Sequence, residues 1–270
     1  MTSAPPSPDT APATLHTESI GEGPRLVMAH GFTQTGRVWG TLDQRLATDH
    51  RAVKVDMPGH AGSTGVAADL AGGARMLAEA GGAATYLGYS MGARFCLHLA
   101  VARPELVDRL VLISGTAGID DLAERAARRR ADEAVAAELD PLDGRTGMPV
   151  AEFLRRWLDG PLFAGISPET AGFDERLRNT GAGLASSLRL AGAGTVDPLW
   201  AQLGELTMPV LVITGERDEK FTALGRRLVG AVGATATHVV LAGAGHSPQL
   251  QRPDAVAALV RNFPARPSPR

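Results

Sequence analysis

The sequence predicts an α/β protein in which a mostly parallel, doubly wound sheet is covered by helices on both faces. Short runs rich in Val, Ile and Leu alternate along the chain with longer segments of helical periodicity. Those runs are apolar throughout, as in strands buried on both faces, whereas a strand with one solvent face would alternate. A chain of 270 residues, 44% of them hydrophobic, is long enough for one large core. The expected strands cover residues 26–29, 52–55, 84–87, 110–113, 210–213 and 238–241.

The chain begins with a segment, residues 1–13, that we expect to be a disordered tail. It is rich in Pro, Ala, Ser and Thr and lacks the basic-then-apolar pattern of a signal peptide. No apolar segment reaches the roughly 18 residues of a membrane span, so we expect a cytoplasmic protein without membrane insertion. A formal net charge of −2 and a pI near 6.4 argue against a nucleic-acid partner. We therefore expect a small-molecule ligand and favour a monomer.

The third expected strand leads directly into a helix. In "ATYLGYSMGARFCLHLAVARP" the apolar strand gives way, after Ser90, to a helical pattern that Pro104 closes. The single cysteine, Cys96, lies inside that pattern, which favours a buried thiol and excludes an internal disulfide.

After the strand at 110–113 no strand signal appears until residue 210. The intervening sequence is charged, Ala-rich and helical, as in "DLAERAARRRADEAVAAEL". We expect a helical cap insertion at 117–197, an α/β core made of 14–116 and 198–264, and a second loose tail at "PARPSPR".

The stretch Gly88-Tyr89-Ser90-Met91-Gly92 predicts a sharp turn between strand and helix. In a Gly-x-Ser-x-Gly elbow the serine adopts a strained backbone conformation, and the glycines let the strand and the helix pack closely. The hydroxyl then projects from the carboxyl edge of the sheet at a helix N-terminus, where free N–H groups favour a developing anion. Taken alone, the pattern is also compatible with an ordinary strand-to-helix loop.

A base and an orienting acid for Ser90 follow later in the chain. The segment "PVLVITGERDEKF" places Asp218 a few residues past a strand, and "HVVLAGAGHSP" places His246 after the next strand. A serine needs a base to accept its proton, and that base needs an acid to orient it. The three residues, each at the carboxyl end of a strand, therefore predict a catalytic triad. Asp56 and Glu216 are alternative acids, for which a loop-bracing role is favoured.

Another loop contributes to the same edge of the sheet. In "MAHGFTQTGRVW", His30 begins a glycine-bearing loop after a strand, and the Phe32 N–H can join the Met91 N–H as an oxyanion hole. The remaining histidines lie in strand, helix or exposed-loop patterns that favour packing or surface roles: His16, His50, His60, His98 and His238.

Over nearly its whole length the chain resembles the α/β-hydrolase superfamily, with the inserted helices as a cap domain. The elbow and four further segments, "ISGTAGIDDLAERAARRRADE", "RWLDGPLFAG", "RLRNTGAGLASSLRLAGAG" and "GERDEKFTALGRRL", resemble the synthases of menaquinone biosynthesis that form 2-succinyl-6-hydroxy-2,4-cyclohexadiene-1-carboxylate. The resemblance implies a lyase that eliminates pyruvate from 2-succinyl-5-enolpyruvyl-6-hydroxy-3-cyclohexene-1-carboxylate. The chain has Ala93 and Ala61 where such enzymes usually have glycine, and we expect little geometric effect because alanine is also small.

The resemblance also implies residue roles. Ser90 would abstract a ring-side proton, with His246 as its partner and Asp218 orienting His246. Arginines would bind the several carboxylates of the substrate, and aromatic side chains would line the pocket. The substrate-binding residues that it implies are His30, Tyr89, Arg94, Arg128, Trp157 and Arg178. The alignment of the motifs leaves Arg125 or Arg129 open in place of Arg128, and Arg176 in place of Arg178.

The chemistry of Arg94 points to an anion independently of the resemblance. It lies four residues after Ser90, one helical turn along, where an unpaired charge beside a buried elbow would be costly. The alternatives are a pair with an acid of the inserted helices, or contact with solvent. Arg128 could equally form i,i+4 pairs on a solvated helix face, Trp157 could pack the insertion onto the core, and Tyr89 could serve only to shape the elbow.

Two other functional classes fit the same fold. One is a carboxylesterase or related serine hydrolase, a perhydrolase included, with an acyl-enzyme on Ser90, and the arginines argue against it. The other is a non-catalytic binding protein, against which the Ser90, Asp218 and His246 set argues. No His and Asp residues show the spacing of a metal site, so we expect neither a metal nor a cofactor.

Overall fold

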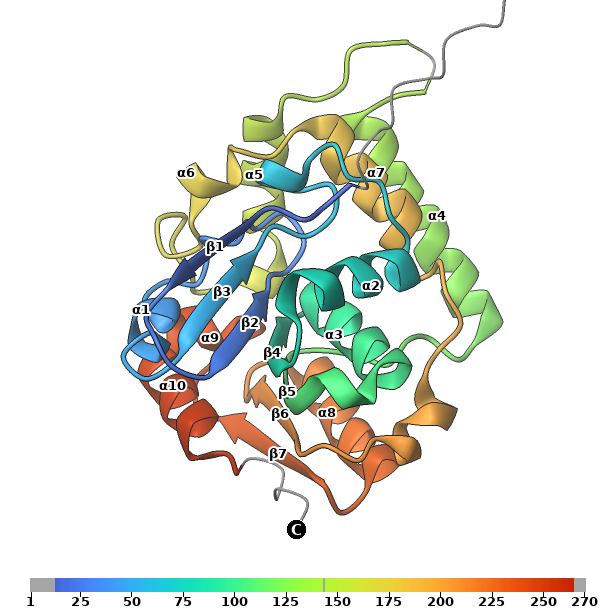
Figure 1. The fold of residues 1–270 in the computed structure, drawn as a ribbon. Coiled ribbons are helices and arrows are strands. Elements are labelled where there is room, and N and C mark those ends of the chain that lie inside the picture. The colour runs from blue at the N-terminus through green and yellow to red at the C-terminus, as the bar shows by residue number, and fades with distance from the viewer. Residues whose placement is uncertain (1–12, 143, 265–270) are drawn as a thin grey trace, which may run out of the picture.

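The structure is a computed structural model that describes residues 13–142 and 144–264 (Figure 1). The expected disordered tail at 1–13 lies outside the described residues except for its last residue, and most of the C-terminal tail also lies outside them.

A seven-stranded sheet forms the centre of the molecule, in the order β1-β3-β2-β4-β5-β6-β7. All neighbouring strands pair in parallel except β1, which runs antiparallel to β3. The predicted class, with its mostly parallel sheet, is therefore confirmed. The strands are β1 (Thr17–Ile20), β2 (Arg25–Ala29), β3 (Arg51–Val55), β4 (Ala84–Tyr89), β5 (Val107–Ile113), β6 (Val210–Gly215) and β7 (Ala236–Leu241).

The strand β1 is one that the apolar runs do not predict. Its sequence, Thr-Glu-Ser-Ile, alternates between exposed and half-buried positions at the edge of the sheet. An edge strand needs no continuous apolar run, because only one of its sides is paired and its faces stay partly open to water.

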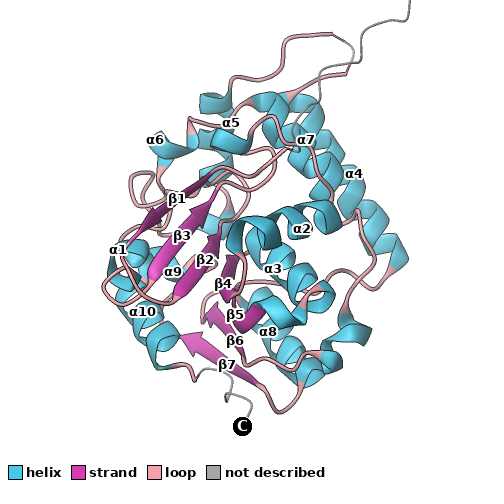
Figure 2. Ribbon diagram, viewed as in Figure 1, coloured by secondary structure: helices cyan, strands magenta, loops and turns pink. Residues whose placement is uncertain are grey.

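Helices cover both faces of the sheet (Figure 2). Successive residues of β2 divide between the two sides: Val27 packs into the core beneath α2, α3 and α8, whereas Leu26 packs into the core beneath α1 and α10. Both residues are fully buried, which explains why the run is apolar throughout. The helices of the core are α1 (Leu42–Leu46), α2 (Leu70–Gly81), α3 (Met91–Ala102), α8 (Glu219–Val232), α9 (Pro248–Gln251) and α10 (Pro253–Asn262).

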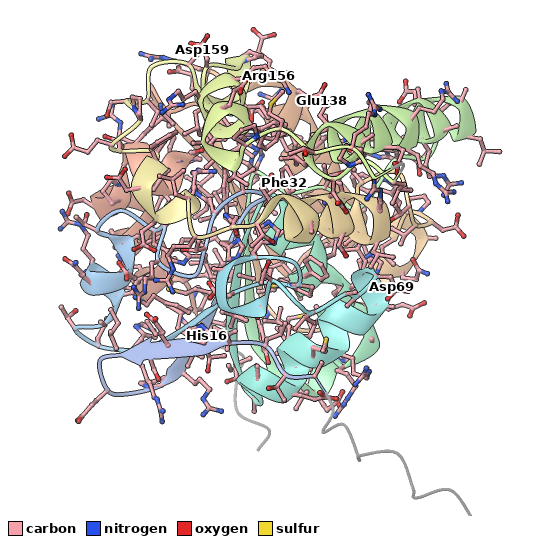
Figure 3. The ribbon with its side chains drawn as sticks, turned by 90° about the horizontal axis from the view of Figure 1, so that it is seen from above. His16, Phe32, Asp69, Glu138, Arg156 and Asp159 are labelled. Carbon is pink, nitrogen blue, oxygen red and sulfur yellow. The ribbon has the colours of Figure 1, made fainter. Side chains whose placement is uncertain are left out.

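Between β5 and β6 the chain leaves the sheet, and its described residues form four inserted α-helices. They are α4 (Leu122–Leu139), α5 (Val150–Leu158), α6 (Phe173–Arg176) and α7 (Gly181–Ala191). Leu139, Phe153 and Leu184 belong to a small core of their own, and an ion pair between Glu138 and Arg156 joins α4 to α5 (Figure 3).

The inserted helices are held to the core by polar contacts at the carboxyl edge of the sheet. The buried Asn179 accepts a hydrogen bond from the Ala61 amide (3.0 Å) and donates one to the Thr33 carbonyl oxygen (2.7 Å). Phe32 packs against both the core beneath α2, α3 and α8 and the core of the insertion. The insertion therefore covers the edge where the predicted site lies. None of the helices within the described ranges is long and apolar enough to cross a membrane.

Candidate active site

Ser90 sits in a strained turn between β4 and α3. Its backbone has φ of 50° and ψ of −105°, a conformation that residues other than glycine rarely adopt. The neighbouring glycines permit it: a Cβ at position 92 would lie 1.9 Å from the Ala29 carbonyl oxygen, and one at position 88 would lie 2.5 Å from the Gly92 oxygen. This is the close approach of strand and helix that the elbow pattern predicts.

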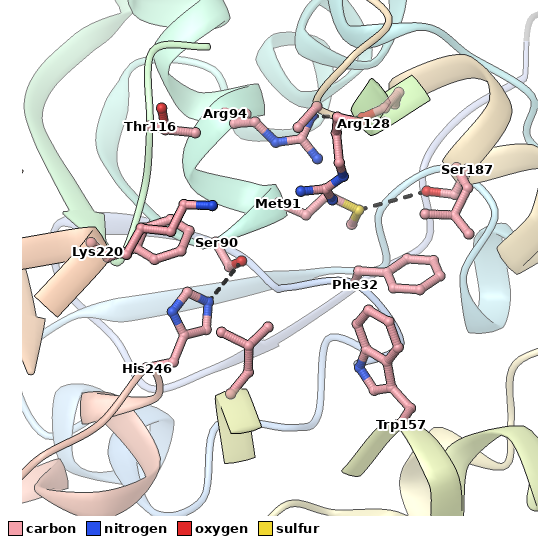
Figure 4. Close-up of a pocket in the computed structure, with 16 residues that line it drawn as sticks. Phe32, Ser90, Met91, Arg94, Thr116, Arg128, Trp157, Ser187, Lys220 and His246 are labelled. Carbon is pink, nitrogen blue, oxygen red and sulfur yellow. Dashed lines mark hydrogen bonds between the residues drawn. The ribbon is translucent and has the colours of Figure 1, made fainter. Parts of the chain in front are cut away.

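The structure brings the three expected triad residues into one hydrogen-bonded chain. His246 Nε2 lies 3.2 Å from Ser90 Oγ (Figure 4), and His246 Nδ1 lies 2.6 Å from Asp218 Oδ2. Asp218 also caps α8, since its Oδ1 accepts a hydrogen bond from the Phe221 amide. The Phe221 ring in turn packs against the His246 ring at 4.4 Å between centroids. The short segment 218–221 therefore caps α8, supplies the acid that contacts His246, and packs a ring against the imidazole.

Two amides near Ser90 are free to donate to a ligand. Met91 is the first residue of α3, where an amide has no acceptor within the helix, and Phe32 lies in a turn closed by the Gln34 amide and the Gly31 carbonyl oxygen (3.1 Å). No acceptor for either amide is found within 13–142 and 144–264. The turn that carries Phe32 includes Thr33, a non-glycine residue with φ of 67°.

Two buried histidines brace that turn, and this corrects the expectation that His30 binds substrate. His30 Nδ1 donates to the Gly31 carbonyl oxygen (2.8 Å), and its Nε2 accepts from the Met57 amide (3.0 Å), so both ring nitrogens are already occupied. His60 likewise accepts from the Thr33 amide. Burial lowers the pKa of His30 to about 4 and that of His60 to about 3, which keeps both rings neutral.

A cavity of about 190 Å³ opens in front of Ser90, between the sheet edge and the inserted helices. Its apolar wall includes Phe32 and Trp157, whose rings meet edge to face at 5.3 Å. The Trp157 Nε1 is buried without a hydrogen-bond partner among the described residues. The cations that line the cavity are Arg94, Arg128 and Lys220.

Arg94 lies in the cavity wall without an acidic partner. Its Nη1 donates to the Ala191 carbonyl oxygen of α7 at 2.7 Å, and no ion pair to it occurs in the part of the chain that the structure describes. Burial and the nearby Arg128 lower the pKa of Arg94 to about 10. A carboxylate in the cavity would offset both effects, because an opposite charge nearby favours the charged form of the guanidinium.

Arg128 lines the cavity but is paired. Its Nε donates to Asp132 Oδ1 at 2.8 Å, one helical turn along α4, as the solvated-face alternative anticipates. The second Asp132 oxygen is buried and has no hydrogen-bond partner among the described residues. Arg125, one of the alternatives, pairs instead with Asp197.

Arg178 and Tyr89 do not line the cavity, contrary to expectation. Arg178 is exposed, because the turn after α6 directs it outward, and its Nη1 lies 3.6 Å from Glu175 Oε2. Its neighbour Arg176 is fully buried, but it contacts Thr33, the Ala171 carbonyl oxygen and the Phe163 ring rather than the cavity. The Tyr89 hydroxyl is 2.7 Å from Ser247 Oγ, and burial raises the pKa of Tyr89 to about 12.

Lys220 also lines the cavity, although the sequence patterns did not predict it as a site residue. A signal was present, because the chain has two lysines and Lys220 stands two residues after Asp218. No group of three or more His, Cys, Asp or Glu residues within the described ranges is arranged to hold a metal ion.

Known proteins resemble this chain over most of its length. A family model described as "Alpha/beta hydrolase family" matches residues 26–259. A Bacillus subtilis (strain 168) protein provisionally named 2-succinyl-6-hydroxy-2,4-cyclohexadiene-1-carboxylate synthase is 33% identical, covering 90% of this chain and 92% of that protein. A pimeloyl-[acyl-carrier protein] methyl ester esterase of Xanthomonas campestris pv. campestris (strain B100) is 31% identical, covering 93% and 99%. The structure of MenH from S. aureus has a TM-score of 0.82 at 24% identity, covering 92% and 97%, which is a likeness of fold.

Proposed function

Because this chain belongs to the alpha/beta hydrolase family, we propose that it is a carbon–oxygen lyase that uses Ser90, His246 and Asp218 as a catalytic triad. Its substrate is 2-succinyl-5-enolpyruvyl-6-hydroxy-3-cyclohexene-1-carboxylate, and its products are pyruvate and 2-succinyl-6-hydroxy-2,4-cyclohexadiene-1-carboxylate, an intermediate of menaquinone biosynthesis. The observation that carries the proposal is Arg94, a cation without an acidic partner among the described residues, in the cavity wall beside Ser90.

The reaction is an elimination across the ring. Ser90 Oγ, hydrogen-bonded to His246 Nε2, takes the proton from C2, which is acidic because it lies beside the succinyl carbonyl group. The C2–H electrons form a C2=C3 double bond, the ring double bond moves to C4=C5, and the C5–O bond breaks. Pyruvate leaves as its enolate and is protonated to pyruvate. His246 carries the proton from Ser90, and Asp218 orients His246.

The surroundings of Ser90 stabilise the charge that this step creates. As C2 loses its proton, negative charge develops on the succinyl carbonyl oxygen, which the Phe32 and Met91 amides bind. Arg94 and Arg128 hold substrate carboxylates, and the inserted helices act as a cap that excludes water. Trp157, which lines the cavity, supports the ring of the substrate.

The test is to supply the enolpyruvyl precursor, made enzymatically from isochorismate and 2-oxoglutarate, and to measure pyruvate release. We expect Ser90→Ala to lower turnover by several orders of magnitude while the circular dichroism spectrum and melting temperature stay unchanged. Activity of Ser90→Ala within tenfold of wild type would remove Ser90 from the mechanism.

A second candidate is a carboxylesterase that forms an acyl-enzyme on Ser90, favoured by the 31% identity to the Xanthomonas campestris pv. campestris esterase. Methyl and p-nitrophenyl esters distinguish it from the lyase. Rapid ester hydrolysis with a burst of alcohol release, together with no pyruvate from the precursor, supports the esterase.

A further inference from the structure

We propose that Lys220 is a third anion-binding residue of the cavity, so that the site selects ligands with carboxylates on more than one side. Arg94 and Arg128 reach the cavity from α3 and α4, whereas Lys220 reaches it from α8, on the His246 side of Ser90 (Figure 4). The inference rests on the proposed function for the identity of the substrate, but not for the binding of carboxylates.

The place of Lys220 in the fold is an unfavourable one for a cation. It lies in the first turn of α8, two residues after the capping Asp218, where the positive end of the helix dipole disfavours positive charge. No ion pair to Lys220 occurs within the described residues, 13–142 and 144–264. The other lysine, Lys54, is paired, since its Nζ lies 3.1 Å from Asp43 Oδ2. Phe221 packs on His246, which keeps the adjoining turn, and Lys220 with it, beside the triad.

The charges around the cavity require anions to balance them. Among the described residues, three cations and no carboxylate line it, and Asp132 offsets one of the three cations through its pair with Arg128. Two positive charges are thus left for a ligand. A di- or tricarboxylate balances these two charges, whereas a monocarboxylate leaves one of them unpaired, so the more highly charged ligand fits better. Lys220 is exposed at the mouth of the cavity, where an entering anion meets it early.

The experiment measures the binding of acetate, succinate and propane-1,2,3-tricarboxylate by calorimetry, and the KM and kcat for the precursor. The variants are Lys220→Gln, Lys220→Arg and, as a matched control, Arg226→Gln, which removes one exposed charge from the same helix outside the cavity. We expect Lys220→Gln to weaken tricarboxylate binding and raise KM by about tenfold, with kcat much less affected, because one charge-assisted hydrogen bond is lost. Lys220→Arg recovers part of the loss, and Arg226→Gln changes neither value.

The results test the role of Lys220 and the proposed function separately. If Lys220→Gln and Arg226→Gln behave alike, or if wild type shows no preference for the tricarboxylate over acetate, the inference is overturned, even where pyruvate is released. If the precursor is not turned over but tricarboxylate binding depends on Lys220, the inference stands and the proposed function fails.

Discussion

Arg94 is the single residue on which the proposed binding of a substrate carboxylate depends most. Its guanidinium lies in the cavity wall beside a second cation, Arg128, and its one acceptor in the part of the chain that the structure describes is the Ala191 carbonyl oxygen. The same group is thus available to a carboxylate on one side and ties α3 to α7 on the other. The two roles lead to different outcomes on substitution.

We predict that Arg94→Ala lowers kcat/KM for the precursor by roughly 30- to 1000-fold, or ~2–4 kcal/mol, because a charge-assisted contact in a desolvated site is lost. Cleavage of p-nitrophenyl acetate, a small neutral ester, should stay nearly unchanged, since the triad and the two amides remain. Arg94→Lys should recover only part, because an ammonium group lacks the planar fork. If both substrates are affected equally, Arg94 acts by holding the elbow to α7.

The buried histidines His30 and His60 make the stability of the protein depend on pH. Their folded-state pKa values, about 4 and about 3, lie below the unfolded value near 6.5. As the pH falls below about 6.5, the unfolded chain binds protons that the folded protein does not, so the free energy of unfolding decreases by up to ~1.4 kcal/mol per pH unit for each histidine. The loss continues until the folded pKa values are reached.

We therefore predict that urea unfolding shows a falling free energy between pH 7 and pH 5, and that His60→Gln reduces this slope by about one proton. Glutamine keeps one donor for the Pro58 carbonyl oxygen and one acceptor for the Thr33 amide but does not titrate. An unchanged slope in His60→Gln would show that other groups cause the acid sensitivity.

At the scale of elements, the elbow depends on the contact between β2, β4 and α3. Gly92 touches the Ala29 backbone, whereas Gly230 in α8 has open space around its Cβ position. The two glycines therefore respond in opposite directions to the same substitution. One is required by close packing, and the other only weakens a helix.

We predict that Gly92→Ala destabilises the protein by ~1–3 kcal/mol or more and reduces activity, because the backbone of β2 or α3 must move to admit the methyl group. Gly230→Ala, as the control, should stabilise the protein by ~0.5–1 kcal/mol. Both are measured by urea unfolding monitored by circular dichroism. Equal effects of the two substitutions would contradict the close approach at the elbow.

At the scale of the whole molecule, the cavity exists only while the inserted helices stay docked on the sheet edge. Asn179 makes buried polar contacts to that edge, since its side chain bonds to Ala61 and Thr33, two residues with positive φ. The neighbouring Arg178 is exposed and pairs only with Glu175 among the described residues. Asn179 therefore holds the inserted helices to the core, whereas Arg178, next to it in the sequence, lies on the surface.

We predict that Asn179→Ala lowers the free energy of unfolding by about 3 kcal/mol, because it leaves a buried amide and a buried carbonyl oxygen unpaired. Hydrogen exchange should increase in α6 and α7, and turnover of the precursor should fall. Arg178→Ala should change stability by less than ~0.5 kcal/mol and leave KM unaffected. A large rise in KM for Arg178→Ala would instead restore the expected substrate contact.

The sequence by itself determined the class of the fold and the candidate triad. Five of the six predicted strands could be recognised because residues buried on both faces must be apolar, and the sixth, β7, is a partly exposed edge strand that still has a short apolar run. The elbow could be recognised because its glycines meet a local steric demand. Ser90, Asp218 and His246 each follow a strand of the parallel sheet, so their convergence follows from strand direction alone. The edge strand β1 could not be predicted in this way, because its residues are exposed or half-buried and its sequence contains no apolar run.

Only the tertiary structure decided which charged side chains face the cavity. In α4 arginines stand on several faces, and the packing of α4 against α7 is what brings Arg128 to the cavity and leaves Arg125 with Asp197. Likewise, the turn after α6 buries Arg176 and exposes Arg178, and α8 brings Lys220 beside His246. The physical reason is that local sequence specifies which residues are apolar, whereas the direction of a charged side chain depends on how distant helices pack against one another.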